Sequence, residues 1–222
     1  SGPGAASAAV GGGLAAIRRD PVLASILAGG IVLVLVVQGV NVVEVFLVRD
    51  ALGASPAQFG LGELFFAAGS IAASFVVARL RSDRLRVAGV LGGFGLSALV
   101  CVGIGLVPTF PGYLGLLVAL GLFNAVANGG TGPLFLLRTP EELRGRVMAA
   151  LGGSFAAASL VALVFGGLAG TWLGPRVTFV AGGGLAFLVV LGMAAVSLPA
   201  VAAAPQPAGS TETDQPAGRP SR

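Results

Sequence analysis

Six long apolar stretches occupy most of this chain of 222 residues and limit its fold more than any other feature. Each is at least as long as the roughly 20 residues that a helix needs to cross about 30 Å of hydrocarbon. The turns between them are too short for a soluble domain, so we expect an all-α integral membrane protein with a six-transmembrane-helix bundle. The stretches are Val22–Val48, Ala57–Ala78, Val87–Val107, Gly112–Leu137, Val147–Gly170 and Val177–Leu198.

The basic residues distinguish the two sides of the membrane. All thirteen are arginine, and only Arg49 and Arg176 lie on the side opposite the two termini. The side of the termini holds Arg18, Arg19, Arg79, Arg81, Arg84, Arg86, Arg138, Arg144, Arg146, Arg219 and Arg222. Because basic residues favour the cytoplasmic side, we expect both termini to be cytoplasmic and the protein to span the plasma (inner) membrane. The pI near 11.0 therefore reports orientation and does not indicate a nucleic-acid partner.

Composition excludes several classes of function. The chain is 55% hydrophobic and 10% charged, which a water-soluble domain of this length cannot accommodate. It has no histidine and one cysteine, Cys101, so histidine-based catalysis and a disulfide within the chain are excluded. The sequence holds no phosphate-binding loop and no cluster of metal ligands. We expect no enzymatic activity, no cofactor and no metal, and we interpret Cys101 as a small packing residue.

The chain divides into three parts with different compositions. We interpret residues 1–20 as a cytoplasmic linker, residues 21–199 as the six-helix transmembrane domain and residues 200–222 as a disordered cytoplasmic tail. The six helices form two sets of three with opposite orientation, the inverted topology of many secondary transporters. Small residues four positions apart, as in Gly69/Ala73, Gly89/Gly93 and Gly166/Gly170, predict close helix packing.

Polar side chains inside the apolar stretches are the candidate functional residues. A carboxylate or amide that faces lipid costs up to a few kcal/mol, so such groups are expected to point into the bundle or a wet cavity. The candidates for a substrate or proton pathway are Gln38, Asn41, Glu44, Glu63, Asn124 and Asn128. The first three follow at intervals of three residues, and the two asparagines of the fourth stretch share one helical stripe.

Each candidate also has a structural alternative. Glu44 lies one turn from an external turn, where it can extend to the interface or pair with Arg49. Glu63 lies deeper and has no basic neighbour in sequence, so it either lines a pathway, where it can carry a proton, or has a structural role. Asn124 and Asn128 either line a pathway or form hydrogen bonds between helices. The sequence alone leaves these alternatives open.

Three turns carry recognisable motifs. The internal turn before the fifth stretch contains Pro140-Glu-Glu-Leu-Arg-Gly-Arg-Val147, and the external turn after the first contains Asp50-Ala-Leu-Gly-Ala-Ser-Pro-Ala-Gln-Phe-Gly60. The other internal turn is Arg79-Leu-Arg-Ser-Asp-Arg-Leu-Arg86. In their order along the chain and on these sides of the membrane, the motifs resemble the major facilitator superfamily, in particular its drug-efflux branch of macrolide and enterobactin exporters. The last one resembles that family's Gly-x-x-x-Asp-Arg-x-Gly-Arg-Arg motif, with Arg79 and Arg86 at its two glycine positions.

The resemblance implies that the chain covers helices seven to twelve of a twelve-helix fold. The first twenty residues would then end the central cytoplasmic linker, and the other six-helix half would belong to the same full-length chain or to a second copy. The path for a small-molecule substrate would run between the halves, with all six pathway candidates on path-forming helices. Cytoplasmic gating would involve Asp83, Arg84, Arg144 and Arg146.

The function that this resemblance implies is efflux of small amphipathic molecules, drug-like or siderophore-like, by alternating access and driven by the proton gradient. Two alternatives remain open. The chain is a non-transporting six-helix scaffold or accessory protein, or it is the membrane subunit of an ATP-driven transporter. The last alternative is disfavoured because the longest internal turn has only about ten residues, whereas such subunits need cytoplasmic coupling elements.

Overall fold

A computed structural model describes residues 13–80 and 82–203. Six of its helices are long and apolar enough to cross a membrane, which confirms the predicted six-helix membrane fold. The helices are α2 (Pro21–Phe46), which continues into the π-helical turn η1 (Leu47–Ala51), α3 (Pro56–Val77), α4 (Asp83–Leu106), α5 (Phe110–Leu137), α6 (Glu141–Leu173) and α7 (Pro175–Ala203). A short helix at residues 13–17 precedes them.

Local chemistry fixes most of the helix starts. Asp20 accepts hydrogen bonds from the backbone N–H groups of Val22 and Leu23 at the start of α2. Ser55 and Gln58 form a reciprocal capping box at the start of α3, and Ser82 caps α4. Helices α4 and α6 begin several residues earlier than their predicted apolar stretches. Because acidic residues favour the first turn of a helix, the charged sequence that follows Pro140 is helical rather than a turn.

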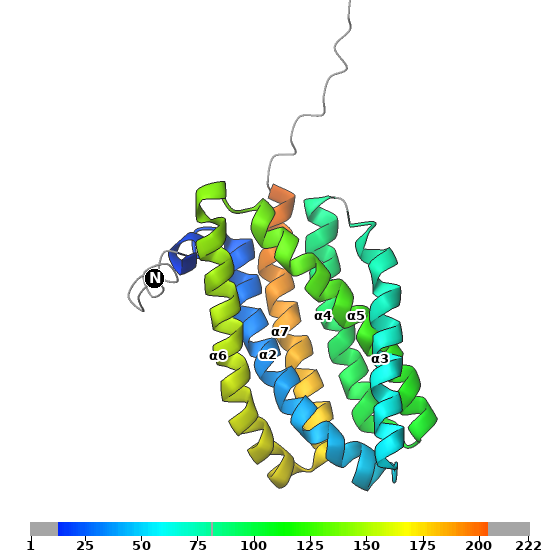
Figure 1. The fold of residues 1–222 in the computed structure, drawn as a ribbon. Helices are drawn as coiled ribbons and strands as arrows, with labels where there is room; N and C mark the ends of the chain where they lie inside the picture. Colours follow the sequence, from blue (N-terminus) through cyan, green and yellow to red (C-terminus); the bar gives the residue numbers. More distant parts are fainter. Residues whose placement is uncertain (1–12, 81, 204–222) are drawn as a thin grey trace, which may run out of the picture.

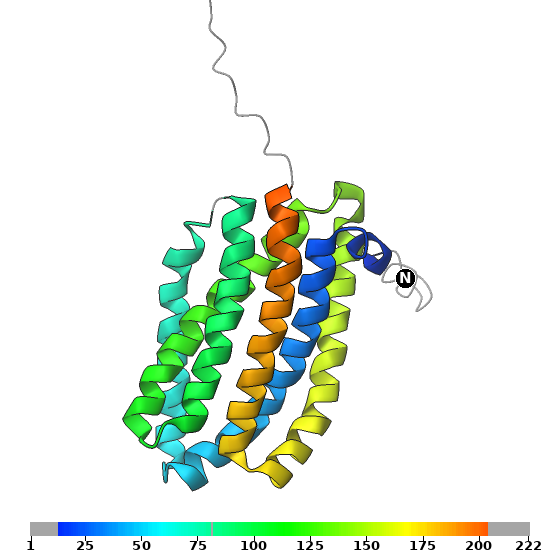
Figure 2. The same cartoon turned by 180° about the vertical axis from the view of Figure 1, so that it is seen from behind.

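The six helices do not pack in chain order. Their order in space is α6, α2, α7, α4, α5, α3, because each of these neighbouring pairs packs along its length. Figure 1 shows the face on which α6, α2, α5 and α3 lie in front. Figure 2, from behind, shows α7 (orange) and α4 (green) in front on the opposite face.

The packing pattern repeats between the two sets of three helices. If α2, α3 and α4 are matched with α5, α6 and α7, the contact of α3 with α5 corresponds to that of α6 with α2. The contact of α4 with α5 likewise corresponds to that of α7 with α2, and the contact of α4 with α7 corresponds to itself. The two sets are therefore interleaved, with the inverted topology expected from the sequence.

Close backbone approach between α3 and α5 depends on two glycines. A Cβ atom on Gly69 would clash with the carbonyl of Val118, and one on Gly121 would clash with the carbonyl of Phe66. The Ser70 hydroxyl donates across the same contact to the Gly121 carbonyl, at 3.3 Å. The predicted close packing holds for Gly69, and Gly93 approaches α5 in a similar way. The surroundings of Gly166 and Gly170 lie outside the described residues.

The segment before α2 packs against the bundle. Ile17 is buried in a hydrophobic cluster to which α2, α4, α5, α6 and α7 all contribute. Gly13 lies so close to the start of α6 that a Cβ atom there would clash with the Arg146 carbonyl. The predicted linker boundary at residue 20 stays a prediction, as does the predicted tail, most of which lies outside the described residues.

Candidate functional site

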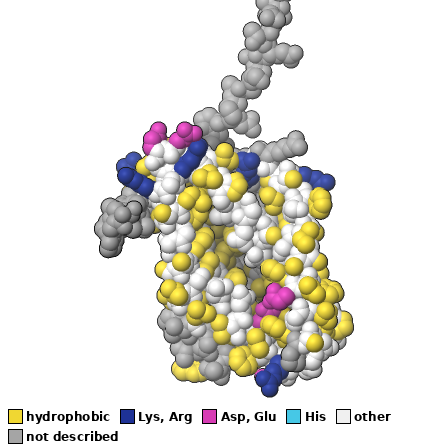
Figure 3. All heavy atoms as spheres, viewed as in Figure 1, with side chains coloured by type: hydrophobic (Ala, Val, Ile, Leu, Met, Phe, Trp, Pro, Cys, Tyr) yellow, Lys and Arg dark blue, Asp and Glu magenta, His cyan; other side chains and the backbone are white. Residues whose placement is uncertain are grey.

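A cavity of about 390 Å³ lies among the helices of the bundle. Figure 3 shows a hollow in the face formed by α6, α2, α5 and α3, with acidic side chains (magenta) below it to the right. The wall is mostly apolar and includes Phe66, Phe94, Phe155 and Phe179 from four different helices. The polar side chains in the wall are Gln38, Asn41, Glu44, Ser97, Asn124, Asn128, Thr131 and Ser159.

The structure brings together five of the six residues proposed from the sequence as pathway residues. Gln38, Asn41 and Glu44 reach this cavity from α2, and Asn124 and Asn128 reach it from α5. Glu63 on α3 is exposed and does not line the cavity. Participation of these residues in transport stays a prediction.

Glu44 is held by a residue that the sequence did not single out. The Tyr113 hydroxyl on α5 donates a hydrogen bond to Glu44 Oε1 on α2, at 2.5 Å. The Tyr113 side chain is buried, at 1% exposure, in the cluster at this end of the bundle. The suggested pairing of Glu44 with Arg49 is not observed. Arg49 lies instead 3.9 Å from the Asp50 carboxylate, and both side chains are exposed.

The amides in the cavity bond within their own helices. Asn41 donates to the Gln38 side-chain carbonyl at 3.2 Å, and Asn128 donates to both oxygens of Asn124 at 2.9 Å. The two pairs lie on α2 and α5, helices that do not pack along each other. These bonds therefore do not support the interpretation of Asn124 and Asn128 as hydrogen-bonding contacts between helices. Both residues remain part of the cavity wall.

Ser97 on α4 is a second cavity residue that the sequence did not single out. Its side chain is buried, at 7% exposure. Among the side chains that the structure describes, its hydroxyl is the one buried oxygen or nitrogen without a hydrogen-bond partner. A buried hydroxyl without a partner costs about 1–3 kcal/mol. Cys101, one turn further along α4, lines the same cavity rather than only packing between helices.

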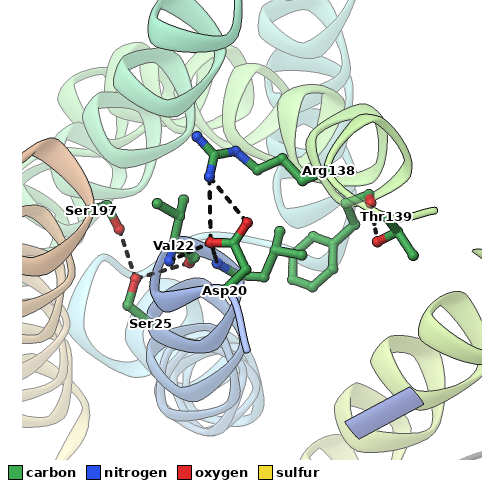
Figure 4. Close-up of polar contacts among 8 residues, drawn as sticks. Asp20, Val22, Ser25, Arg138, Thr139 and Ser197 are labelled. Carbon is green, nitrogen blue, oxygen red and sulfur yellow. Dashed lines mark hydrogen bonds and ion pairs between the residues drawn. The ribbon is translucent and has the colours of Figure 1, made fainter. Parts of the chain in front are cut away.

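An ion pair joins the start of α2 to the end of α5. Arg138, just after α5, donates to the Asp20 carboxylate at 3.1 Å, and the two side chains are 17% and 25% exposed. Figure 4 shows the Arg138 side chain extending over the start of α2, where Asp20 also caps the helix. The Ser25 and Ser197 hydroxyls, 2.7 Å apart, join α2 to α7 in the same region.

The four proposed gating residues have different surroundings. Arg144 binds the Glu141 carboxylate at 3.0 Å and the carbonyls of Leu136 and Thr139, so it joins the start of α6 to the end of α5. The side chains of Arg84 and Arg146 are exposed. Asp83 is the first residue of α4, and its side chain lies outside the described part of the structure. The gating role of all four stays a prediction.

Signals for the missed residues were weak but present. Tyr113 is the only tyrosine of the chain, and it lies near the end of an apolar stretch, where tyrosine is common as an interface anchor. Ser97 is one of several serines in apolar stretches, and most of these bond to a carbonyl of their own helix. In the part of the chain that the structure describes, no three side chains of His, Cys, Asp or Glu are grouped as metal ligands.

Comparison with known proteins gives one match. The family model described as Major Facilitator Superfamily matches residues 26–220, a range that begins inside the first membrane-spanning helix and includes the other five. No curated protein and no solved structure matches the chain significantly. The interleaved six-helix arrangement fits half of the fold of that family. The chain is therefore a multi-pass membrane protein that belongs to the major facilitator superfamily of transporters.

Proposed function

We propose that the chain is one half of a twelve-helix exporter that moves small amphipathic molecules out of the cell by alternating access. The other six-helix half belongs to the same full-length chain or to a second copy. Efflux is coupled to the proton gradient, and the substrates belong to the drug-like or siderophore-like molecules handled by the branch that the sequence motifs resemble.

The observation that carries this proposal is the position of the cavity. It opens on the face formed by α6, α2, α5 and α3, and its wall combines four phenylalanines with amides, hydroxyls and the Glu44 carboxylate. Such a wall suits an amphipathic substrate. A face with exposed Glu63 and half-buried Glu44 is costly against lipid, which supports a second half packed over it.

The arginine distribution supports an orientation with both termini in the cytoplasm, in the plasma (inner) membrane. Single-cysteine reporters in the full-length protein test it. A membrane-impermeant maleimide applied to intact cells should label Arg49→Cys at the end of α2 and should leave Arg146→Cys at the start of α6 unlabelled. The reverse pattern would invert the topology and with it the proposed direction of transport.

The size of the native protein tests the proposal of a half. An antibody against the segment 205–222 should detect a band near twice the 21.7 kDa of this chain in membranes of the source cells. A band near 21.7 kDa would instead indicate a six-helix product that must pair with itself or with another half, and it would favour the scaffold alternative.

Transport itself is tested with the full-length protein expressed in efflux-deficient bacteria. Three amphipathic probes are used: cationic rhodamine 6G, neutral chloramphenicol and anionic fluorescein. The cells should accumulate less of at least one of them, and a protonophore should abolish this difference. The Glu63→Gln and Glu44→Gln variants should reduce efflux, whereas Asp50→Asn, an exposed acid at the same end, should not. If the accumulation of every probe is unchanged although the membrane contains a normal amount of the protein, the non-transporting scaffold alternative is favoured.

A further inference from the structure

The unpartnered hydroxyl of Ser97 points to a ligand in the cavity. Ser97 belongs to α4, which lies on the face opposite the predicted path, yet its side chain reaches the cavity wall. It is more than nine-tenths buried and has no hydrogen-bond partner among the described residues. A buried polar group of this kind is stabilised when a bound molecule supplies the missing hydrogen bond.

The ionisable lining of the same cavity is acidic. Among the described residues that line it, Glu44 alone is ionisable as a carboxylate, and no arginine lines it. Arg49, the nearest basic residue in sequence, lies beside Asp50. Tyr113 occupies Glu44 Oε1, while Oε2 accepts no hydrogen bond from the part of the chain that the structure describes. A half-buried carboxylate without a cationic partner favours a cationic ligand.

The apolar wall provides the rest of the recognition. Phe66, Phe94, Phe155 and Phe179 come from α3, α4, α6 and α7, so aromatic rings surround the cavity on several sides. Aromatic faces attract organic cations as well as apolar groups. Cys101 follows Ser97 by one helical turn on the same cavity wall, which Glu44 also lines. The hydroxyl and the carboxylate are therefore reachable by one drug-sized molecule.

We propose that this cavity binds an amphipathic organic cation whose charged group pairs with Glu44 Oε2 and whose polar group bonds to the Ser97 hydroxyl. The proposal rests on the proposed transport function, because it names the substrate class of the same cavity. It assigns to α4, an outer helix, a residue that determines specificity.

Binding to the full-length protein in lipid nanodiscs tests this directly. Fluorescence anisotropy measures rhodamine 6G, a xanthene cation with an ester carbonyl, and fluorescein, an anion with the same ring system. Displacement of rhodamine 6G measures tetraphenylphosphonium, a cation that has no group for a hydrogen bond. Empty nanodiscs correct for partition into lipid. Both cations should bind at least about tenfold more tightly than fluorescein, and equal or tighter binding of fluorescein would overturn the proposal.

Variants separate the two contacts. Glu44→Gln keeps the shape of the side chain and an acceptor for Tyr113, and it should reduce the affinity for both cations by about tenfold or more. Ser97→Ala should reduce the affinity for rhodamine 6G by about threefold to tenfold and leave the affinity for tetraphenylphosphonium unchanged. Only rhodamine 6G has an acceptor for the Ser97 hydroxyl. The controls are Asp50→Asn and Ser74→Ala. Ser74 is an exposed serine that bonds within α3.

The outcomes distinguish this inference from the function on which it rests. If Ser97→Ala reduces the affinity for both cations equally, or for neither, the role of the hydroxyl is overturned, provided that the variant elutes as a single species on size exclusion. Ser97→Cys, which is only slightly larger but is a weaker hydrogen-bond donor, should likewise reduce the affinity for rhodamine 6G more than that for tetraphenylphosphonium. If the cells export chloramphenicol or fluorescein while neither cation binds, the cation site is wrong and the transport function stands.

Discussion

Tyr113 and Glu44 join α5 to α2 at one end of the cavity, and the ion pair of Arg138 with Asp20 joins the same two helices at the other end. Helices α2 and α5 do not pack along each other between these points. The cavity lies in the space between them. The bundle is thus joined across its opening by polar contacts at both ends, and each contact is open to a direct test.

Removal of the Tyr113 hydroxyl should destabilise the protein. Tyr113→Phe keeps the buried ring but loses a hydrogen bond to a carboxylate, which is worth about 1.5–3 kcal/mol. For a chain of this size, each kcal/mol lowers the thermal midpoint by about 2–4 °C. Thermal unfolding in detergent measures the change. A cycle with Glu44→Ala, which removes the acceptor, should show coupling between the two sites, and strictly additive effects would contradict a direct bond.

The two roles of Asp20 can be separated. Asp20→Asn keeps a side-chain oxygen that can cap α2 but loses the charge that binds Arg138. Because both partners are largely shielded from water, we expect a loss of about 1–2 kcal/mol in the free energy of unfolding. Asp20→Ala should cost about 1 kcal/mol more, since the cap is also lost. Arg19→Gln, at an exposed neighbour, is the control, and equal effects of Arg19→Gln and Asp20→Asn would refute the ion pair.

Helix α5 offers a matched pair of glycines. Gly121→Ala should force α3 and α5 apart, because the new methyl group meets the Phe66 carbonyl, at a cost of about 1–3 kcal/mol. Gly115→Ala, six residues earlier, places its methyl group in open space and should be neutral or slightly stabilising. The yield of monodisperse protein by fluorescence-detected size exclusion compares them. Similar yields would show that the helices can separate at little cost.

The two arginines on the side opposite the termini should differ in their structural role. Arg176 donates to the carbonyls of Gly105 at 3.3 Å and Val107 at 3.0 Å, where α4 ends. The Arg49 side chain is 81% exposed. Arg176→Ala should therefore speed amide exchange at the end of α4 by about tenfold, the equivalent of about 1.4 kcal/mol, whereas Arg49→Ala should not. Exchange is measured by mass spectrometry on peptides that cover residues 103–107.

Hydropathy was sufficient to predict the six helices, because lipid demands about twenty apolar residues in each. It failed at the starts of α4 and α6. Asp83 and Glu141 are charged, so they were assigned to turns, yet acids at these positions stabilise the first turn. The order of helices in space was not predictable from any span alone, since it depends on which surfaces meet.

The candidate site was predictable where a residue type is costly in lipid. Gln38, Asn41, Glu44, Asn124 and Asn128 stand out in apolar stretches, and the structure brings them to one cavity. Glu63 stands out equally but lies outside the wall, because helical phase and neighbours decide which way a side chain points. Tyr113 and Ser97 are tolerated in a span, so only their three-dimensional partners, or the lack of one, identify them.

The interleaved packing has a consequence for the order of assembly during synthesis. Helix α2 leaves the ribosome first among the six, yet it packs along α6 and α7, which are made last. Helix α3 likewise waits for α5. The early helices must therefore remain in the bilayer with Glu44 unshielded until the second set of three, which carries Tyr113, arrives. A nascent chain arrested before α5 should be prone to capture by chaperones or degradation, whereas release after α7 should protect it.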